Sequence, residues 1–169
     1  TNTTPLTPPA NGTETVECPS DATDPGAPAD ITDACGNTIS ATFVSEVSTP
    51  DPITCSGTVV WTYEYEDCNG ATYPWTYTYT VNNTSPLTPP ANGSETVECP
   101  GDATDPGAPA DITDACGNTI SATFVSEVST PDPIICSGTV VWTYEYEDCN
   151  GATYPWTYTY TVNNTSPLT

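Results

Sequence analysis

Cysteine is the most reactive residue type in this 169-residue chain, and its eight copies follow a regular spacing. They stand at Cys18, Cys35, Cys55, Cys68, Cys99, Cys116, Cys136 and Cys149. No two of them lie within four residues of each other and the chain contains no His, so the spacing does not fit a zinc site. An even number of cysteines in a small module is typical of disulfides formed in an oxidising, extracellular setting. We therefore expect all eight cysteines to be disulfide-bonded.

The acidic residues offer a second kind of chemistry. The chain has 22 Asp and Glu but no Lys or Arg, which gives a formal net charge of −22. Carboxylates in loops are ligands that Ca²⁺ prefers, and one segment rich in Pro and Gly contains Asp21, Asp24, Asp30 and Asp33. The sequence has no EF-hand loop and no glycine-aspartate nonapeptide, so a solvated acidic loop competes with a calcium site at these residues. Calcium is the one cofactor that the sequence suggests, and we predict no other.

The residue types that are missing exclude several classes of function. Catalysis by a Ser-His-Asp triad, a Cys-His pair or a Lys nucleophile needs residues that this chain lacks. Without Lys or Arg the chain cannot bind the phosphates of nucleic acid or an anionic membrane surface. Paired carboxylates could hydrolyse a glycoside, but the acidic residues fall in turns and on outward strand positions. The sequence has no apolar run of about 18 residues, so we predict no membrane insertion in this segment, and no enzyme.

The elements that must position the cysteines are repeated. Residues 1–88 and 82–169 align without a gap at an offset of 81 and differ at five positions, which is typical of modular arrays. Each repeat holds four cysteines. We expect one domain at residues 9–82 and a second at 90–163, with linkers at 1–8, 83–89 and 164–169. Because both ends of the chain carry the linker sequence, we expect further identical repeats along the same fibre.

Within a repeat the hydrophobic residues alternate with polar ones. Two such runs, residues 59–66 and 72–81, are joined at Asn69-Gly70 and predict a long antiparallel hairpin. A third strand is expected from Ile39 to Val47, with Phe43 and Val47 facing inward and Glu46 outward. Shorter strands are expected at 14–18 and 31–35. No segment has a helical period, so the sequence predicts an all-β fold with an immunoglobulin-like β-sandwich in each repeat and its aromatic residues in the core.

The segment between the repeats, NNTSPLTPPANGS, is rich in Pro and should be extended and semi-rigid. Asn-x-Ser/Thr sequons gather in and beside the linkers, at Asn2, Asn11, Asn82, Asn83, Asn92, Asn163 and Asn164. We expect N-linked glycans at some of these residues. The abundant Thr offers O-linked attachment as well, although β propensity on exposed sheet faces also accounts for its frequency.

Geometry narrows the disulfide pairing within a repeat. Cys55 and Cys68 flank a predicted strand of ten residues, which holds its ends about 30 Å apart, whereas a disulfide needs Cα atoms within about 7 Å. They cannot pair, and Cys18 with Cys35 is then excluded too if all four are bonded. In an immunoglobulin-like sandwich the first strand should finish near the start of the Cys55 strand. We therefore predict Cys18 with Cys55 and Cys35 with Cys68, and the equivalent pairs Cys99 with Cys136 and Cys116 with Cys149.

The segments ECPSDAT, DACGNTI, CSGTVVWTYEYEDCNG and WTYTYTV cover most of a repeat. They resemble the cysteine-containing, HYR-like immunoglobulin-type tandem repeats of very large bacterial surface adhesins, among them the gliding-motility adhesins that the type IX system of the Bacteroidota exports. The resemblance implies a cell-surface, filament-forming or adhesive role. The near-identity of neighbouring repeats and the lack of Lys and Arg depart from that pattern and favour a homopolymeric fibre.

We accordingly predict a structural segment of an extracellular filament or adhesin stalk that carries glycans. Its expected partners are identical repeats of the same fibre, other copies of the chain, and glycans. From strand and linker lengths, one repeat should advance the fibre by on the order of 45 to 55 Å. The alternative is a carbohydrate-binding module whose aromatic rows face outward and stack on sugars.

Overall fold

The computed structural model describes residues 4–165, and the chain divides into two compact units, residues 1–84 and 85–169. The first domain contains β1 (Gly12–Val16), β2 (Ile31–Thr32), β3 (Thr38–Ile39), β4 (Thr42–Thr49), β5 (Ser56–Glu66) and β6 (Thr72–Asn82). The second contains β7 (Gly93–Val97), β8 (Ile112–Thr113), β9 (Thr119–Ile120), β10 (Thr123–Thr130), β11 (Ser137–Glu147) and β12 (Thr153–Asn163). Short 3₁₀ turns follow β1 and β7, at Pro19–Asp21 and Pro100–Asp102. No α-helix occurs in residues 4–165, which confirms the all-β prediction of two tandem immunoglobulin-like β-sandwich domains.

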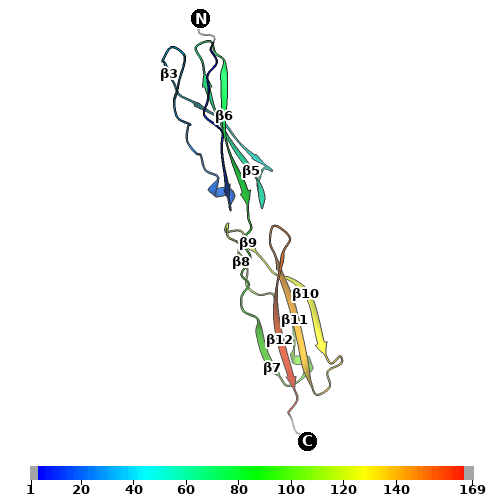
Figure 1. The fold of residues 1–169 in the computed structure, drawn as a ribbon. Helices are drawn as coiled ribbons and strands as arrows, with labels where there is room; N and C mark the ends of the chain where they lie inside the picture. Colours follow the sequence, from blue (N-terminus) through cyan, green and yellow to red (C-terminus); the bar gives the residue numbers. More distant parts are fainter. Residues whose placement is uncertain (1–3, 166–169) are drawn as a thin grey trace. The chain divides into compact units, whose positions relative to one another are not determined.

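Each domain is built on a four-stranded sheet with a two-stranded ribbon beside it. The sheet order is β1-β6-β5-β4 in the first domain and β7-β12-β11-β10 in the second, and the ribbons are β2-β3 and β8-β9. The pairs β4–β5 and β5–β6 are antiparallel, whereas β1 runs parallel to β6. Figure 1 shows the same arrangement in the second domain, where β7 lies beside β12 and β10 lies on the other side of β11.

The predicted hairpin forms the centre of the sheet, and its period of two determines the core. One face of β5 and β6 supplies nearly all the large buried side chains, because successive residues of a strand point to opposite faces. The buried residues of the first domain form two clusters: Leu6, Tyr63, Tyr65 and Trp75 in one, and Ala22, Val59, Tyr79 and Val81 in the other. The second domain repeats both clusters with the equivalent residues.

The layer opposite the sheet is largely irregular chain, and aromatic side chains hold it in place. The Tyr65 hydroxyl donates to the carbonyl of Ala29 at 2.6 Å, and the indole N–H of Trp75 donates to the carbonyl of Ala10 at 2.8 Å. Large aromatic residues gain most from burial when their polar tip also finds a partner. Within residues 4–165 every buried polar side-chain atom has a hydrogen-bond partner. The core therefore fixes loops that have little secondary structure of their own.

In β4, the side chains after Phe43 lie on the opposite faces of the sheet from those predicted. A β-bulge between Phe43 and Ser45 shifts the register, so that Glu46 lies opposite Trp61 and Val47 lies opposite Val60. Residues directly opposite on paired strands point to the same face. Glu46 is therefore on the core side at the sheet edge, and Val47 is on the outer face. The predicted inward Val47 and outward Glu46 were wrong, because an extra residue in one strand exchanges the faces of all that follow.

The segment that was predicted to be a linker is partly inside the domains. Leu87 is buried in the core of the second domain, as Leu6 is in the first. At the other side, the Thr84 N–H donates to Glu17 Oε1 in the first domain at 3.0 Å. Within residues 83–89, Ser85 and Pro86 lie between Thr84, which bonds the first domain, and Leu87, which is buried in the second.

Candidate functional site

Two clusters of cysteine, one at each end of a domain, are the features that could carry function. At the end where β1 finishes and β5 begins, Asn83 N–H donates to the carbonyl of Cys55 at 3.1 Å. The neighbouring Thr84 bonds Glu17, which precedes Cys18. The chain that leaves β6 therefore touches both Cys18 and Cys55 segments. Both cysteines are disulfide-bonded and buried, and since they are the two bonded cysteines of this domain, the bridge joins them.

The opposite end of the domain carries the other two cysteines on a pair of similar turns. Asp33 Oδ1 accepts the N–H groups of Cys35 and Asn37, at 2.9 and 2.8 Å. Asp67 Oδ1 accepts the N–H groups of Asn69 and Ala71 in the same way, at 2.8 and 2.9 Å. The hairpin turn is therefore a five-residue loop organised by Asp67. The predicted junction Asn69-Gly70 lies within this loop.

A glycine in the left-handed region completes each of these two turns. Gly36 has φ of 84° and Gly70 has φ of 81°, values that residues with a Cβ adopt only at a cost. In both turns the glycine stands three residues after the organising aspartate. This D-x-x-G spacing, present in DACG and DCNG, is the signal from which the sequence could have revealed the turns.

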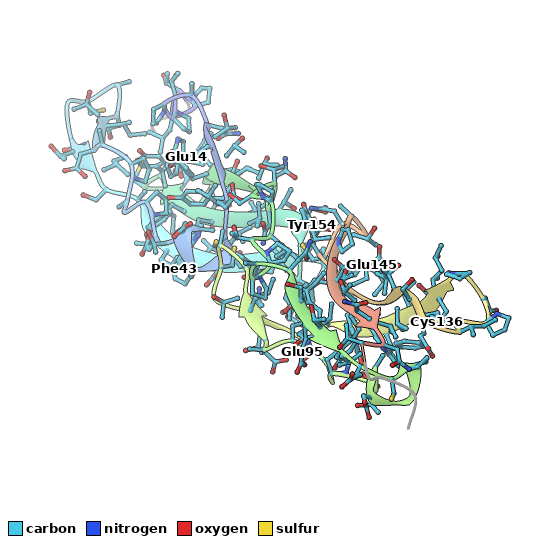
Figure 2. All side chains as sticks on the ribbon, turned by 90° about the horizontal axis from the view of Figure 1, so that it is seen from below. Glu14, Phe43, Glu95, Cys136, Glu145 and Tyr154 are labelled. Carbon is cyan, nitrogen blue, oxygen red and sulfur yellow. The ribbon has the colours of Figure 1, made fainter. Side chains whose placement is uncertain are left out.

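The second domain carries the alternative bridge. There Cys116 and Cys149 are disulfide-bonded, whereas Cys99 and Cys136 are free and exposed. In the first domain Cys35 and Cys68 are the free, exposed pair. Figure 2 labels Cys136 beside the start of β11 and Tyr154 near the start of β12, which lie at opposite ends of that antiparallel pair. Each of the two nearly identical domains thus contains one of the two bridge types predicted for a repeat.

The backbones that carry bonded and free cysteines are almost the same. Cys18 has φ −117° and ψ 149°, and the free Cys99 has φ −117° and ψ 146°. Asn164 N–H donates to the carbonyl of Cys136 at 2.9 Å, as Asn83 does to Cys55. At the other end, the turn glycines Gly70 and Gly151 have φ of 81° and 82°. The geometry that accepts a bridge in one copy is therefore present in the other.

The predicted calcium ligands lie in the loops of the first domain, where they have local partners. Asp21 accepts the N–H of Cys18 at 3.3 Å, and Asp24 accepts both the N–H of Gly26 at 2.8 Å and the hydroxyl of Tyr63 at 2.5 Å. Asp33 organises its turn and Asp30 is exposed. Within residues 4–165, no three acidic or cysteine side chains come together in a way that could hold a metal ion. Calcium binding stays a prediction.

The contact between Tyr63 and Asp24 has an electrostatic consequence. The hydrogen bond to the Asp24 carboxylate, followed by burial of the phenol, raises the pKa of Tyr63 to about 12. Asp105 raises the pKa of Tyr144 to about 12 in the same way in the second domain. A deprotonated phenol would have to face the carboxylate as a second negative charge, so the bond favours the neutral form.

The predicted glycosylation residues differ in accessibility. Asn11, Asn82, Asn92, Asn163 and Asn164 are exposed, Asn83 is 5% exposed, and Asn2 lies outside the described residues. Asn11 and Asn92 accept the N–H groups of Thr76 and Thr157 through Oδ1, both at 3.0 Å. These contacts use the side-chain oxygen, whereas an N-linked sugar attaches to the nitrogen.

The aromatic rows face the core. Trp75 is 7% exposed, Tyr63 is buried beside it, and Tyr79 is buried in the second core cluster. An outward platform for stacking sugars, which the carbohydrate-binding alternative requires, is therefore not formed by these residues. Ring contacts run instead along the core face, from Trp75 to Tyr77 at 6.0 Å and from Tyr77 to Tyr79 at 4.9 Å between centroids.

Comparison with known families identifies the class of these domains. Residues 6–81 and 87–162 each match the HYR-like domain with 4 cysteines. The chain therefore belongs to this family and contains two tandem copies of its domain. HYR-like domains are extracellular repeat modules. No curated protein matches the chain. Among the described residues, no helix has the length and apolar character needed to cross a membrane.

Proposed function

We propose that the chain is a stalk segment of an extracellular filament or surface adhesin of the large bacterial type, in which identical domains provide length. The observation that carries the proposal is the junction. A residue of the first domain, Thr84, and a core residue of the second, Leu87, are separated by two residues of which one is Pro86. So short a spacer leaves nearly the whole repeat within folded domains. In a stalk, successive folded domains of this kind would supply the length.

We further propose that all four cysteines of each domain are bridged in the secreted protein. The support is the equivalence of the two copies: Cys18 pairs with Cys55 in one, and Cys116 with Cys149 in the other, on matching backbones. Closing each remaining pair removes two protons and two electrons, which a protein disulfide donor outside the cytoplasm accepts. The expected result of peptide mapping without reduction is four bridges and no free thiol. A peptide linking Cys18 to Cys68 would contradict the proposal.

We also propose that the stalk carries N-linked glycans on its exposed sequons. Asn82 and Asn92 are exposed on either side of the junction, whereas Asn83 is buried. We therefore expect mass spectrometry of the native protein to find sugar on Asn82 or Asn92 and an unmodified Asn83. Unmodified Asn82 and Asn92 together with unmodified Thr would remove the glycan part of the proposal.

Imaging of the native assembly tests the stalk itself. The expected image is a filament whose axial repeat is on the order of 45 to 55 Å, from an eleven-residue strand and a short spacer. An axial repeat near 20 Å, on the order of half a strand length, would mean that domains lie side by side, and a protein that stays monomeric in its native source would exclude the filament.

A further inference from the structure

We infer that each domain is a tensile clamp, in which the parallel pair of its first and last long strands, β1–β6 or β7–β12, bears load in shear. In the first domain, the Cys18–Cys55 bridge also limits how far the domain can extend. This inference rests on the proposed stalk, because a stalk transmits force through the two ends of every domain. It concerns the mechanical strength of the domain and not the existence of a filament.

The load enters and leaves a domain on two neighbouring strands. The chain enters through β1 and leaves through β6, and these strands pair in parallel over five register positions, from Gly12 opposite Tyr77 to Val16 opposite Val81. Tension pulls β1 back toward its N-terminal side and β6 forward toward its C-terminal side. The two pulls are opposite and lie along the strands, so the hydrogen bonds between them are loaded together and not one after another. Figure 1 shows the equivalent pair, β7 beside β12, in the second domain.

Contacts outside the ladder lengthen the loaded region. Before β1, Ala10 accepts the Trp75 indole N–H, and Asn11 accepts the Thr76 N–H at 3.0 Å. After β6, the Thr84 N–H donates to Glu17, just beyond the end of β1. The incoming and outgoing segments are therefore joined from Ala10 to Glu17.

The side chain of Tyr77 adds a further link between the two strands. Its ring lies where a Cβ on Gly12 would be, so glycine permits this close approach of β1 and β6. Its hydroxyl donates to Glu14 Oε2 at 3.3 Å, two register positions further along β1 than Gly12. Sliding of β1 along β6 must break this bond and move the ring.

The disulfide acts after the ladder fails. Once β1 separates, tension reaches Cys18 and passes through the sulfur atoms to Cys55, the residue before β5. The residues between them, including β4, are bypassed and bear no load. Of the 81 residues in a repeat, about 45 can then extend, which is about 160 Å of chain, whereas a reduced domain can release about 290 Å at the same length per residue.

Single-molecule pulling on the whole 169-residue chain tests the inference by changing the direction of load on the first domain. One experiment pulls the chain by its two ends. The other pulls from the N-terminus to an attachment residue substituted at Asn69, which is exposed in the β5–β6 turn. In the second geometry both attachment points lie at the same end of the β1–β6 pair, so β1 is peeled away one hydrogen bond at a time. Both measurements load the first domain, and the end-to-end pull loads the second domain as well.

We expect the end-to-end unfolding force to be at least about twofold higher than the peeling force, since forced unfolding follows the barrier along the pulled direction. Equal forces would overturn the clamp. For the bridge, we expect the unfolded first domain to extend to about 160 Å of chain without reductant and to about 290 Å with it. An extension near the longer value before reduction would overturn the length limit. Because imaging decides the filament separately, a strong clamp without filaments would refute the stalk alone, and filaments with equal forces would refute the clamp alone.

Discussion

At the scale of single residues, several aspartates stabilise turns and loops, a role that the net charge alone does not indicate. Asp24, Asp33 and Asp67 each accept hydrogen bonds from nearby backbone or hydroxyl groups. A carboxylate accepts such bonds better than a neutral group does. Part of the chain's acidity is therefore needed to build turns, and only the rest is available for solubility.

The Tyr63–Asp24 bond leads to a prediction about alkaline pH. The pKa of Tyr63 rises from 10.0 to about 12 on folding, so its contribution to stability is complete below pH 10 and is lost as the pH rises through 12. We expect a spectrophotometric titration of the ten tyrosines to show a component near pH 12. Tyr63→Phe with Tyr144→Phe should remove it. The matched control, Tyr73→Phe with Tyr154→Phe, should leave it, and a component that survives the first pair would refute the assignment.

The turn aspartates lead to a second prediction at this scale. Asp67→Ala with Asp148→Ala removes the carboxylate that accepts two backbone N–H groups in each hairpin turn. We expect the free energy of unfolding to fall by about 1 kcal/mol per domain, as for the loss of a helix cap or a single hydrogen bond. Asp30→Ala with Asp111→Ala removes the same charge at exposed loop positions and should change stability little. Equal effects in denaturant unfolding would mean that charge alone matters.

At the scale of elements, the hairpin could be predicted and the edge strand could not. In β5 and β6 an aromatic residue or Val stands at every second position from Val59 to Tyr65 and from Tyr73 to Val81, so the core face follows from a period of two. In β4 the bulge after Phe43 changes the period locally, and no residue type marks it. Leu6 and Leu87 were assigned to linkers because isolated apolar residues between prolines show no period, although both enter a core.

For the cysteines too, the sequence could predict some features and not others. Strand length excluded two pairings from the sequence, because a strand holds its ends apart. The bonded pair Cys18 and Cys55 and the bonded pair Cys116 and Cys149 agree with the pairing types that remained. The hydrogen bonds of Glu17 and Asn83 at this end could not be predicted, since they depend on where the chain runs after β6.

Gly12 provides a prediction for the β1–β6 pair. A Cβ at Gly12 or Gly93 would overlap the ring of the opposing tyrosine, Tyr77 or Tyr158. We expect Gly12→Ala with Gly93→Ala to lower the free energy of unfolding by about 1–3 kcal/mol per domain, the usual range for overpacking. Gly101→Ala is the control, because no atom lies within 4 Å of its added Cβ. Denaturant unfolding followed by Trp fluorescence measures both, and no difference between them would show that Tyr77 moves aside freely.

At the scale of the whole molecule, all charged side chains are negative, so they only repel one another. The chain has 22 acidic residues and no basic side chain, so it has no side-chain ion pair for salt to weaken. Added salt can therefore only screen repulsion. This repulsion extends an unfolded chain and also separates neighbouring chains.

Salt and calcium should consequently have separable effects on thermal stability. Raising NaCl from 10 mM to 1 M shortens the screening length from about 30 Å to about 3 Å, and we expect the melting temperature to rise because repulsion is weakened. Comparing CaCl₂ with MgCl₂ at equal ionic strength tests the predicted calcium ligands, of which Asp21, Asp24 and Asp33 already accept hydrogen bonds from local groups. A further rise in CaCl₂ alone, abolished by Asp30→Asn with Asp111→Asn, would establish a calcium site. A melting temperature that falls with NaCl would show that repulsion does not limit the stability of the folded chain.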